Sequence, residues 1–383
     1  MIGVCKETGK NESRVALTPE GVKKLKDTGQ DIIIESGAGT ASSYSDDYYT
    51  EAGAEIGKER SKILSDCDIL LAVQAPAIDD LKKMKKGSVL ISFIWPLQNQ
   101  DYVDVLKEQH ISGLAMDTVP RISRAQSMDA LSSMSNIAGY KAALLGANTL
   151  DKYLPMMMTA AGTIPPAKVL VLGAGVAGLQ AIATAKRLGA VVEAFDIRPA
   201  VKEQVESLGA KFVEAESEDQ DENESEGGES SETKGGYAKE QTESDKEKQQ
   251  KLVHEHVAKS DIVITTALVP GRPAPKLIPK EMVDDMQAGS VIVDIAAEQG
   301  GNCELTKAGE TVNHNGVLIL GPLNMPSMLA YHASKLYSKN VLSLLDLFLE
   351  DGKPNFNFDD EIIINTTVTH EGELISPFVK ENM

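Results

Sequence analysis

The feature that most constrains the fold of this chain is a glycine pattern that begins at residue 173. Gly173, Gly175 and Gly178 form a GxGxxG motif, preceded by the apolar run KVLVL (168–172) and followed by the helix-forming run LQAIATAKRLGA. In such a turn the first glycine permits a tight bend, the second lets a ligand approach the backbone, and the third lets helix and strand pack closely. The pattern predicts a βαβ unit whose helix N-terminus binds the pyrophosphate of a dinucleotide through backbone N–H groups.

A carboxylate follows the second strand of this unit. The run VVEAF (191–195) leads to Asp196, which lies 18 residues after Gly178. A carboxylate at this position hydrogen-bonds the adenosine ribose hydroxyls and repels a 2′-phosphate. The sequence therefore favours NAD(H) over NADP(H), although Arg198, two residues further on, leaves a small opening for that phosphate.

Short apolar runs alternate with helical stretches along the chain. In the second half, six such runs are expected to form the parallel sheet of a dinucleotide-binding domain: 168–172, 191–195, 211–214, 261–267, 290–296 and 317–320. In the first half, strands are expected at 2–5, 31–35, 68–73, 88–95 and 111–117, with helices over 19–29, 46–54 and 99–110. We therefore expect an α/β fold with two Rossmann-like domains, each with a parallel sheet, and an NAD-binding cleft between them.

The expected domain boundaries follow from the same pattern. Residues 1–135 form an N-terminal α/β domain, and the C-terminal segment 330–383 completes it because EIIINTTV (361–368), interpreted as a strand, has no place in the six-stranded sheet. Residues 136–329 form the Rossmann NAD(H)-binding domain. Helices are expected over 136–152 and 325–350, and a loop or buried connector over 156–166.

Charge and cysteine content narrow the partners and the compartment. The chain holds 38 Lys+Arg against 57 Asp+Glu, a formal net charge of -19. A clustered basic surface of the kind that binds nucleic acid is not expected, and neither is binding to an anionic membrane surface. The three cysteines form no CxxC pair, which fits free thiols in a reducing cytosol. The longest apolar run considered as a membrane span, 341–349, is far shorter than the roughly 20 residues that a spanning helix needs.

About half of the net charge is concentrated in one acidic insert, residues 214–234. Ten acidic residues and no basic one lie within 214–232. We expect this insert to be a solvated, disordered spacer. Two alternatives stay open, a halophilic surface adaptation and a repulsion that tunes the closure of the loop that follows it.

A polar segment at 120–132 (PRISRAQSMDALS) is the most unusual one outside the acidic insert. Its polar side chains are spaced so that they share one helix face and the start of that helix: Arg121, Gln126, Asp129 and Ser132. Ser123 or Ser127 is expected to cap the helix. Such a face can hold a nicotinamide ribose and carboxamide, with Arg121 or Arg124 on a phosphate. Composition alone favours the plainer alternative, a solvated helix face.

Residues for acid–base or metal chemistry are not evident. The chain has no GxSxG, P-loop, HExxH or metal-cysteine pattern. His254 and His256 stand in a polar helix without further ligands, so no metal site is predicted. No histidine takes a clear general-acid position. That is unusual for a dehydrogenase of hydroxy or amino acids, which needs a proton carrier beside the hydride path.

Longer motifs carry a resemblance to a known family. The segments NESRVALTP, ESGAG (35–39), GAGVAGLQA, TTALVPGRPAPKLI (265–278) and SVIVDIAAEQGGNCE (290–304) resemble the alanine dehydrogenase and transhydrogenase superfamily. Within it, PRISRAQSMDALSSMSNIAGY (120–140), MMMTAAGTIPPAKV (156–169), KEQVESLGAKF (202–212) and GGYAKE (235–240) are similar to one branch. That branch is the NAD(H)-binding component, domain I, of proton-translocating NAD(P) transhydrogenase.

The resemblance implies a concrete activity. In that family, domain I binds NADH and passes a hydride directly to NADP⁺ on an NADP(H)-binding partner component, while a membrane component couples the step to proton translocation. It also implies a homodimer in the cytoplasm that is peripheral to the inner face of the cell membrane only through its partners. The residues carried over as catalytic are Arg121, Gln126, Asp129 and Ser132. Those carried over as cofactor-binding are Gly173, Ala174, Gly175, Val176, Gly178, Asp196, Ile197, Ala267, Leu268, Tyr140, and Tyr237 of a mobile loop around 235–240.

Two other functions remain as alternatives. By resemblance, alanine dehydrogenase uses a lysine and a histidine at the positions of Gln74 and Trp95, although Arg14 and the carboxylate Glu298 are present here. Hydride transfer between two nicotinamides needs positioning and the exclusion of water rather than a proton carrier. The missing lysine and histidine therefore favour a transhydrogenase component over an amino-acid dehydrogenase. The third possibility is a non-catalytic NAD-sensing module.

Overall fold

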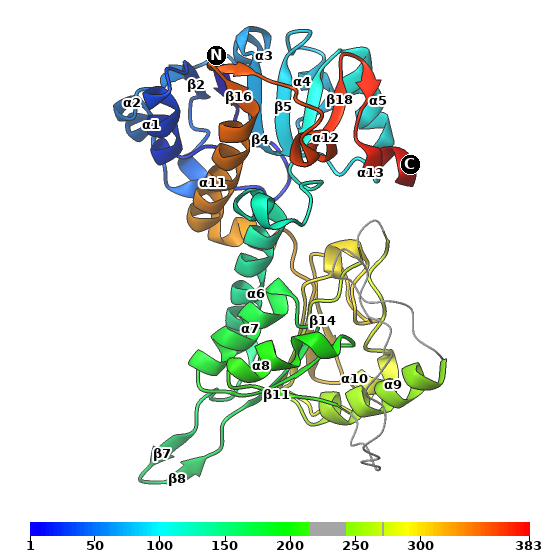
Figure 1. The fold of residues 1–383 in the computed structure, drawn as a ribbon. Helices are drawn as coiled ribbons and strands as arrows, with labels where there is room; N and C mark the ends of the chain where they lie inside the picture. Colours follow the sequence, from blue (N-terminus) through cyan, green and yellow to red (C-terminus); the bar gives the residue numbers. More distant parts are fainter. Residues whose placement is uncertain (215–242, 270–271) are drawn as a thin grey trace. The chain divides into compact units, whose positions relative to one another are not determined.

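The chain folds into two compact units, each built on its own sheet. A computed structural model describes residues 1–214, 243–269 and 272–383 (Figure 1). Unit 1 comprises Met1–Met134 and Pro326–Met383, and unit 2 comprises Ser135–Met325. Both chain ends belong to unit 1. The expected α/β class with two largely parallel sheets is confirmed.

Unit 1 contains an eight-stranded sheet with the order β19-β18-β6-β5-β4-β1-β2-β3. Its strands are β1 (Ile2–Val4), β2 (Ile32–Glu35), β3 (Glu55–Gly57), β4 (Ile69–Gln74), β5 (Val89–Phe93), β6 (Ser112–Ala115), β18 (Thr367–His370) and β19 (Glu373–Leu374). Strands β1 to β6 run parallel. The late strand β18 joins antiparallel to β6. Every residue of β5 is buried, as is typical of a strand covered on both faces.

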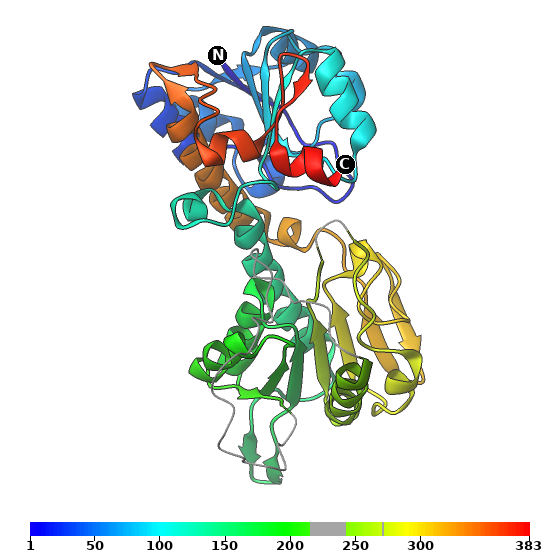
Figure 2. The same ribbon diagram turned by 45° about the vertical axis from the view of Figure 1, so that its right-hand side comes forward.

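The helices of unit 1 come from both ends of the chain. They are α1 (Pro19–Asp27), η1 (Thr40–Ser42), α2 (Asp46–Glu51), α3 (Arg60–Asp66), α4 (Ile78–Leu81), α5 (Gln100–Glu108), η2 (Ser123–Met128), η5 (Met325–Leu329), α11 (Ala330–Phe348), α12 (Glu361–Thr366) and α13 (Pro377–Asn382), with a small ribbon of β16 (Leu349–Glu350) and β17 (Lys353–Pro354). Helix α11 lies beside α1 in both views (Figures 1 and 2). Thr18 precedes α1, but its hydroxyl donates to Ser338 of α11 rather than capping α1.

The prediction of a strand over 361–368 is wrong for its first six residues. They form helix α12, whose first turn is capped by Asp360: its Oδ1 accepts from the backbone N–H groups of Ile362 (2.8 Å) and Ile363 (3.4 Å). A short apolar run is compatible with a buried helix or a buried strand, and here the preceding cap favours the helix.

Unit 2 contains a seven-stranded sheet with the order β11-β10-β9-β12-β13-β15-β14. Its strands are β9 (Lys168–Leu172), β10 (Val191–Phe195), β11 (Lys211–Phe212), β12 (Ile262–Thr265), β13 (Val291–Asp294), β14 (Thr311–His314) and β15 (Val317–Leu320). In the part of the chain that the structure describes, six of these strands run parallel, as predicted. The antiparallel edge strand β14, which alternates exposed and half-buried residues, was not predicted.

The helices of unit 2 cover this sheet. They are α7 (Val176–Arg187), η3 (Pro199–Val201), α8 (Lys202–Ser207), α9 (Glu243–Ala258), α10 (Lys280–Asp284) and η4 (Ala297–Gln299), together with most of α6 (Ala130–Thr149). No helix of the described segments is both long and apolar enough to cross a membrane.

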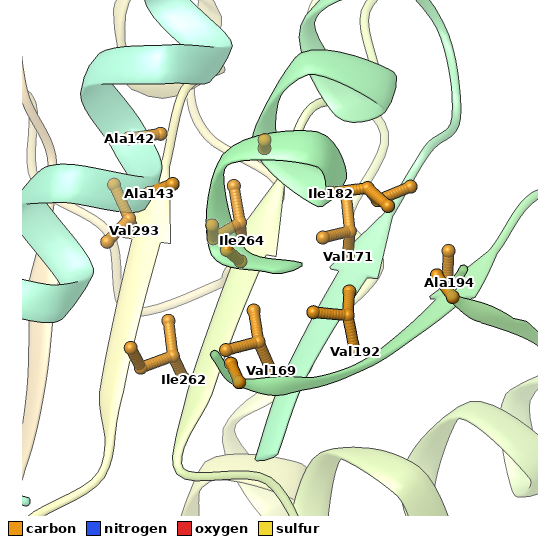
Figure 3. Packing of buried hydrophobic residues seen from close by; sticks show 14 of the residues in the cluster. Ala142, Ala143, Val169, Val171, Ile182, Val192, Ala194, Ile262, Ile264 and Val293 are labelled. Carbon is orange, nitrogen blue, oxygen red and sulfur yellow. The ribbon is translucent and has the colours of Figure 1, made fainter. Parts of the chain in front are cut away.

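Small residues on α6 let it lie close to the sheet. Ala142 and Ala143 lie over the apolar side chains of β12 and β13 (Figure 3). A Cβ on Gly146 would lie 2.9 Å from Cγ2 of Ile262, and a Cβ on Gly139 only 2.0 Å from the carbonyl oxygen of Ala177 in α7. A larger side chain at either glycine would force the backbone to shift, which explains the alanine- and glycine-rich sequence of this helix.

Residues 156–166 are neither a loop nor buried. They contain a hairpin of β7 (Met157–Thr159) and β8 (Gly162–Ile164), which extends away from the body of unit 2 in both views (Figures 1 and 2). Met156 and Met158 are 58% and 77% exposed. The consecutive methionines suggested burial, whereas the two-residue turn and the register between the strands make an exposed hairpin.

Candidate functional site

The glycine pattern forms the turn between β9 and α7, and each glycine is required by its surroundings. Gly173 has a φ of 99°, in the left-handed region that favours glycine. A Cβ on Gly178 would lie 1.8 Å from the carbonyl oxygen of Gly173, so helix and strand touch at their backbones. Next to a Cβ on Gly175, by contrast, the nearest atom is Nη2 of Arg198 at 4.0 Å. The turn is therefore closed on its inner side and approachable at Gly175.

The N-terminus of α7 has donors for an anion. Gly175 occupies the N-cap position, and no side chain caps the helix. Its first backbone N–H groups have no intrahelical acceptor, and the helix dipole favours negative charge there. Val176, the first helical residue, is 43% exposed. These features fit the pyrophosphate of a dinucleotide.

Asp196 lies at the carboxyl end of β10 and contacts the glycine turn directly. Its Oδ2 accepts from the backbone N–H of Ala174 at 2.7 Å. Arg198 donates to the same carboxylate from its backbone N, Nε and Nη2, each at 2.9 Å. Ile197 lies half-buried between them. Asp196 is thus adjacent to the turn, but the guanidinium of Arg198 is bound to it rather than open to a phosphate.

The loop after β12 lies on the other side of β9, which places it at the topological switch point of the sheet. Thr266 donates its hydroxyl to the carbonyl oxygen of Gly173 at 2.9 Å. Ala267 follows half-buried and Leu268 is 38% exposed. The structure therefore brings Gly173, Asp196 and Ala267 together at the carboxyl ends of three neighbouring strands.

Asn302 holds this loop in place, although sequence reasoning did not single it out. It is fully buried. Its Oδ1 accepts from the backbone N–H of Ala267 at 3.0 Å, and its Nδ2 donates to the carbonyl oxygens of Ala267 (2.9 Å) and Pro275 (2.8 Å). No local sequence signal points to it, because its partners lie 35 and 27 residues away.

Asp294 is a second organising residue that was missed. Its fully buried carboxylate accepts from Thr265 Oγ1 (2.9 Å), Thr306 Oγ1 (2.6 Å), and the backbone N–H groups of Ala296 (3.1 Å) and Cys303 (3.0 Å). It connects the ends of β12 and β13 to the segment that carries Asn302. The signal that identified Asp196, a carboxylate at the end of a buried strand, also applies to Asp294.

Two tyrosines were predicted to contact the cofactor. Tyr140 lies on α6 directly after Gly139 and is 39% exposed. Tyr237, the loop around 235–240 and nearly all of the acidic insert lie outside the described residues.

The polar segment at 120–132 belongs to unit 1, and it does not form one continuous helix. Gln126 lies on η2 and is exposed, as is Arg121 just before it. Asp129 separates η2 from α6 and caps α6, because its Oδ1 accepts from the backbone N–H of Ser132 at 2.8 Å. The hydroxyl of Ser132 donates to Oδ2 of Asp129 at 2.6 Å. Asp129 and Ser132 are therefore together, whereas the shared helix face and the serine caps were wrong.

Arg124 of the same segment is already paired. Its guanidinium donates two hydrogen bonds to Asp360, at 2.7 and 3.0 Å. Because Asp360 also caps α12, this contact ties the polar segment to the C-terminal part of unit 1. The Arg124 guanidinium beside it lowers the pKa of Asp360.

A buried charged group stands at the carboxyl ends of β1 and β4. Arg14 donates to Glu12 from Nε (2.8 Å) and Nη2 (2.6 Å), and both side chains are nearly inaccessible. The amide of Gln74 donates to Glu12 Oε2 at 3.2 Å. Burial raises the pKa of the neighbouring Glu7 to about 7, although Glu7 accepts from the backbone N–H of Val73.

Trp95 follows β5 in a left-handed backbone conformation with a φ of 53°. The carboxylate of Asp117 supports this conformation by accepting from the backbone N–H groups of Ile94 (2.7 Å) and Trp95 (3.0 Å). Burial raises the pKa of Asp117 to about 6. The indole ring stacks on Phe93 with a centroid distance of 5.8 Å.

The remaining candidates form ordinary pairs. His254 contacts Asp285 at 2.7 Å and His256 contacts Glu193 at 2.6 Å. Among the side chains of the described segments, no three His, Cys, Asp or Glu residues are grouped so that they could hold a metal ion. Cys5, Cys67 and Cys303 are buried free thiols, as predicted.

Comparisons with known proteins agree with this architecture. The family descriptions "Alanine dehydrogenase/PNT, N-terminal domain" and "Alanine dehydrogenase/PNT, C-terminal domain" match residues 3–138 and 142–377. The chain is 48% identical to the first of the separate chains of the NAD(P) transhydrogenase alpha subunit of Rhodospirillum rubrum, over 98% of each chain. The crystal structure of the transhydrogenase from Sinorhizobium meliloti has 44% identity and a TM-score of 0.87, covering 98% of this chain and 99% of that one.

Similarity to alanine dehydrogenases is lower. The enzyme of Mycolicibacterium smegmatis is 29% identical, over 100% of this chain and 96% of the relative. Both family descriptions, and transhydrogenase relatives at 43% to 48% identity, cover nearly the whole chain. The chain therefore belongs to the alanine dehydrogenase/PNT family of NAD(H)-binding oxidoreductases, and within it resembles NAD(P) transhydrogenase alpha subunits more than that alanine dehydrogenase.

Proposed function

We propose that this chain is the NAD(H)-binding component of a proton-translocating NAD(P) transhydrogenase, which transfers a hydride from NADH to NADP⁺ on a partner component. The NADP(H)-binding component and a membrane proton-channel component are its proposed partners. We place the chain in the cytoplasm, at the inner face of the cell membrane through these partners. Support comes from the similarity to subunits of that name along the whole chain.

One observation carries the choice between the two activities of the family. At the carboxyl edge of the unit 1 sheet stand Gln74 and Trp95, and neither side chain carries or relays a proton at neutral pH. Arg14, which could anchor a substrate carboxylate, is bound by Glu12. Oxidative deamination of an amino acid needs such an anchor and a proton carrier, whereas transfer between two nicotinamides requires neither.

The glycine turn and its neighbours are proposed to bind the adenosine half of the cofactor. The open side of Gly175 and the uncapped N-terminus of α7 bind the pyrophosphate. Asp196, with Ile197, binds the adenosine ribose. Ala267 and Leu268, on the loop held by Asn302, contact the cofactor further along. Gly173, Ala174, Val176 and Gly178 shape the turn that makes these contacts.

The polar segment of unit 1 is proposed to orient the nicotinamide, which supplies the hydride when NADH is bound. Arg121, Gln126, Asp129 and Ser132 are the residues in this role. Asp129 and Ser132 are held rigidly by their mutual hydrogen bonds, whereas Gln126 is exposed and so accessible to a ligand. Tyr140 and Tyr237 are proposed to close over the cofactor and exclude water.

We also propose that the chain forms a homodimer. The hairpin of β7 and β8 supports this proposal, because Met156, Met158 and Ile164 expose apolar area on an element with little cover from unit 2. Replacing Met158 by lysine should weaken the dimer in analytical ultracentrifugation, whereas the same change at exposed Val191 should not. A monomeric wild-type chain would contradict the proposal.

Hydride transfer in a reconstituted mixture tests the proposed function. The chain is mixed with NADH, the NADP(H)-binding component of a related transhydrogenase, and an NADP⁺ analogue whose reduced form absorbs at its own wavelength. Turnover that needs the partner component supports the proposal. Gln126→Ala should then slow transfer far more than it weakens NADH binding, and an unchanged rate would refute the role of that residue.

The alternatives give different results in the same assay. Turnover with NADH, pyruvate and ammonia in the absence of the partner would identify an amino-acid dehydrogenase. NADH binding without turnover in either mixture would favour an NAD-sensing module.

A further inference from the structure

The carboxylate of Asp196 has no acceptor position left for a ligand. Its Oδ1 accepts from the backbone N and the Nε of Arg198, and its Oδ2 accepts from Ala174 N and from Arg198 Nη2. An ionised carboxylate offers about four lone-pair positions, and four donors occupy them. An adenosine ribose can bind Asp196 only if one of these donors leaves.

The guanidinium of Arg198 is the donor that can leave. The other two donors are backbone N–H groups of the glycine turn and of Arg198 itself, and the fold fixes their positions. The guanidinium belongs to a long side chain with several rotatable bonds, and this side chain is 18% exposed. Its rotation releases two of the four acceptor positions at once.

The guanidinium already lies where the ligand is expected. Its Nη2 is 4.0 Å from the position of a Cβ on Gly175, on the approachable side of the turn. Released from Asp196, it stays within side-chain reach of the ribose 2′ position, where NADP(H) carries its phosphate. A guanidinium binds a phosphate with the same two-pronged geometry that it uses for a carboxylate.

We propose that Arg198 is a specificity-determining residue of the adenosine subsite. Its guanidinium exchanges between Asp196 and a ribose 2′-phosphate, so that the site accepts 2′-phosphorylated adenosine nucleotides as weaker second ligands. Asp196 repels the phosphate and Arg198 attracts it, and together they set the ratio of the two affinities. The inference rests on the proposed binding of NAD(H) at this turn. It matters for a chain whose proposed partner holds NADP(H).

Calorimetric titration with two adenosine fragments tests the inference without the partner component. The probes are 5′-AMP and adenosine 2′,5′-bisphosphate, which differ only in the 2′-phosphate. Arg198→Ala should weaken binding of the bisphosphate by about tenfold more than binding of 5′-AMP, because a charged hydrogen-bond pair is lost only with the former. Arg198→Lys keeps the charge but loses the planar fork, and it should show most of the same change.

Two further variants separate this mechanism from a general effect of charge. Lys202→Ala removes a nearby positive charge that is paired with Glu214 rather than Asp196, and it should leave the affinity ratio unchanged. Asp196→Asn should improve bisphosphate binding only while Arg198 is present, so the double variant with Arg198→Ala should lose that gain. Far-UV circular dichroism verifies that each variant is folded.

Several results would overturn the inference. They are an equal loss of affinity for both probes in Arg198→Ala, an affinity ratio in Arg198→Lys that matches the wild type, and a wild type that does not bind the bisphosphate at all. Failure to bind 5′-AMP would remove the nucleotide site and the inference with it. Failure of hydride transfer despite normal fragment binding would refute the proposed function alone, because the affinity ratio does not depend on the partner.

Discussion

Replacing Asn302 by alanine should release the loop that is proposed to bind the middle of the cofactor. The substitution removes three hydrogen bonds at once, two with the backbone of Ala267 and one with the carbonyl oxygen of Pro275. Asn302 is fully buried, so water does not replace its amide without a rearrangement. At about 1 kcal/mol net for each bond, the loss is roughly 3 kcal/mol.

Hydrogen exchange at the Ala267 amide measures this loss directly. Because 1.4 kcal/mol corresponds to about a factor of ten, exchange should accelerate by roughly a hundredfold in Asn302→Ala if it proceeds by local opening. NADH should also bind more weakly, because the loop that carries Leu268 is no longer held. Mass spectrometry of a peptide that spans 264–269 gives the exchange rate, and a fluorescence titration gives the affinity.

The matched control is Asn313→Ala. Asn313 is exposed on β14 and accepts one hydrogen bond, from the backbone N–H of Gly316 at 3.0 Å. Its replacement should leave the exchange of Ala267 and the affinity for NADH unchanged. If the Ala267 amide in Asn302→Ala stays as protected as in the wild type, Asn302 does not hold the loop.

Three further predictions follow from the contacts described. Gly178→Ala places a methyl group 1.8 Å from the carbonyl oxygen of Gly173, so it should cost roughly 2–3 kcal/mol in urea unfolding and abolish NADH binding; retained binding would contradict the close contact. Burial raises the pKa of Glu7 from 4.5 to about 7. The folded state therefore holds the proton more tightly, and stability falls as pH rises from about 4.5 to about 7. Glu7→Gln should reduce this slope in unfolding curves at pH 5 and pH 8, and an identical slope would refute the assignment. Asp360→Ala should cost about 1–2 kcal/mol because it removes a helix cap and an ion pair, whereas Arg124→Ala, which spares the cap, should cost only a few tenths; equal losses in thermal unfolding would show that the cap contributes nothing.

Local sterics made the nucleotide turn predictable. Gly173 and Gly178 are required because any side chain would collide with the backbone within the same βαβ unit, so the requirement is visible in a short stretch of sequence. The position of Asp196 follows from the length of that unit. Asn302 was missed because its hydrogen bonds join segments that are far apart in the sequence and carry no spacing pattern.

The polar segment shows where spacing misleads. Residues 126, 129 and 132 have helical spacing, but the chain changes from η2 to α6 at Asp129, which caps α6 instead of lying on its face. The same competition decided 361–366, where the carboxylate of Asp360 starts a helix in a run whose composition suits a strand. In both places a side-chain hydrogen bond to the backbone outweighed a pattern of apolar or polar residues.

Trp95, held in its left-handed conformation beside Asp117, is the one tryptophan in the sequence. Unit 2 is therefore dark at tryptophan wavelengths, and intrinsic fluorescence reports on unit 1 alone. Far-UV circular dichroism, by contrast, sums the helices of both units. Coincident unfolding curves from the two signals would mean that the chain melts as one cooperative block, and separated curves would give each unit its own transition. The composition thus supplies a built-in optical label for one half of the protein.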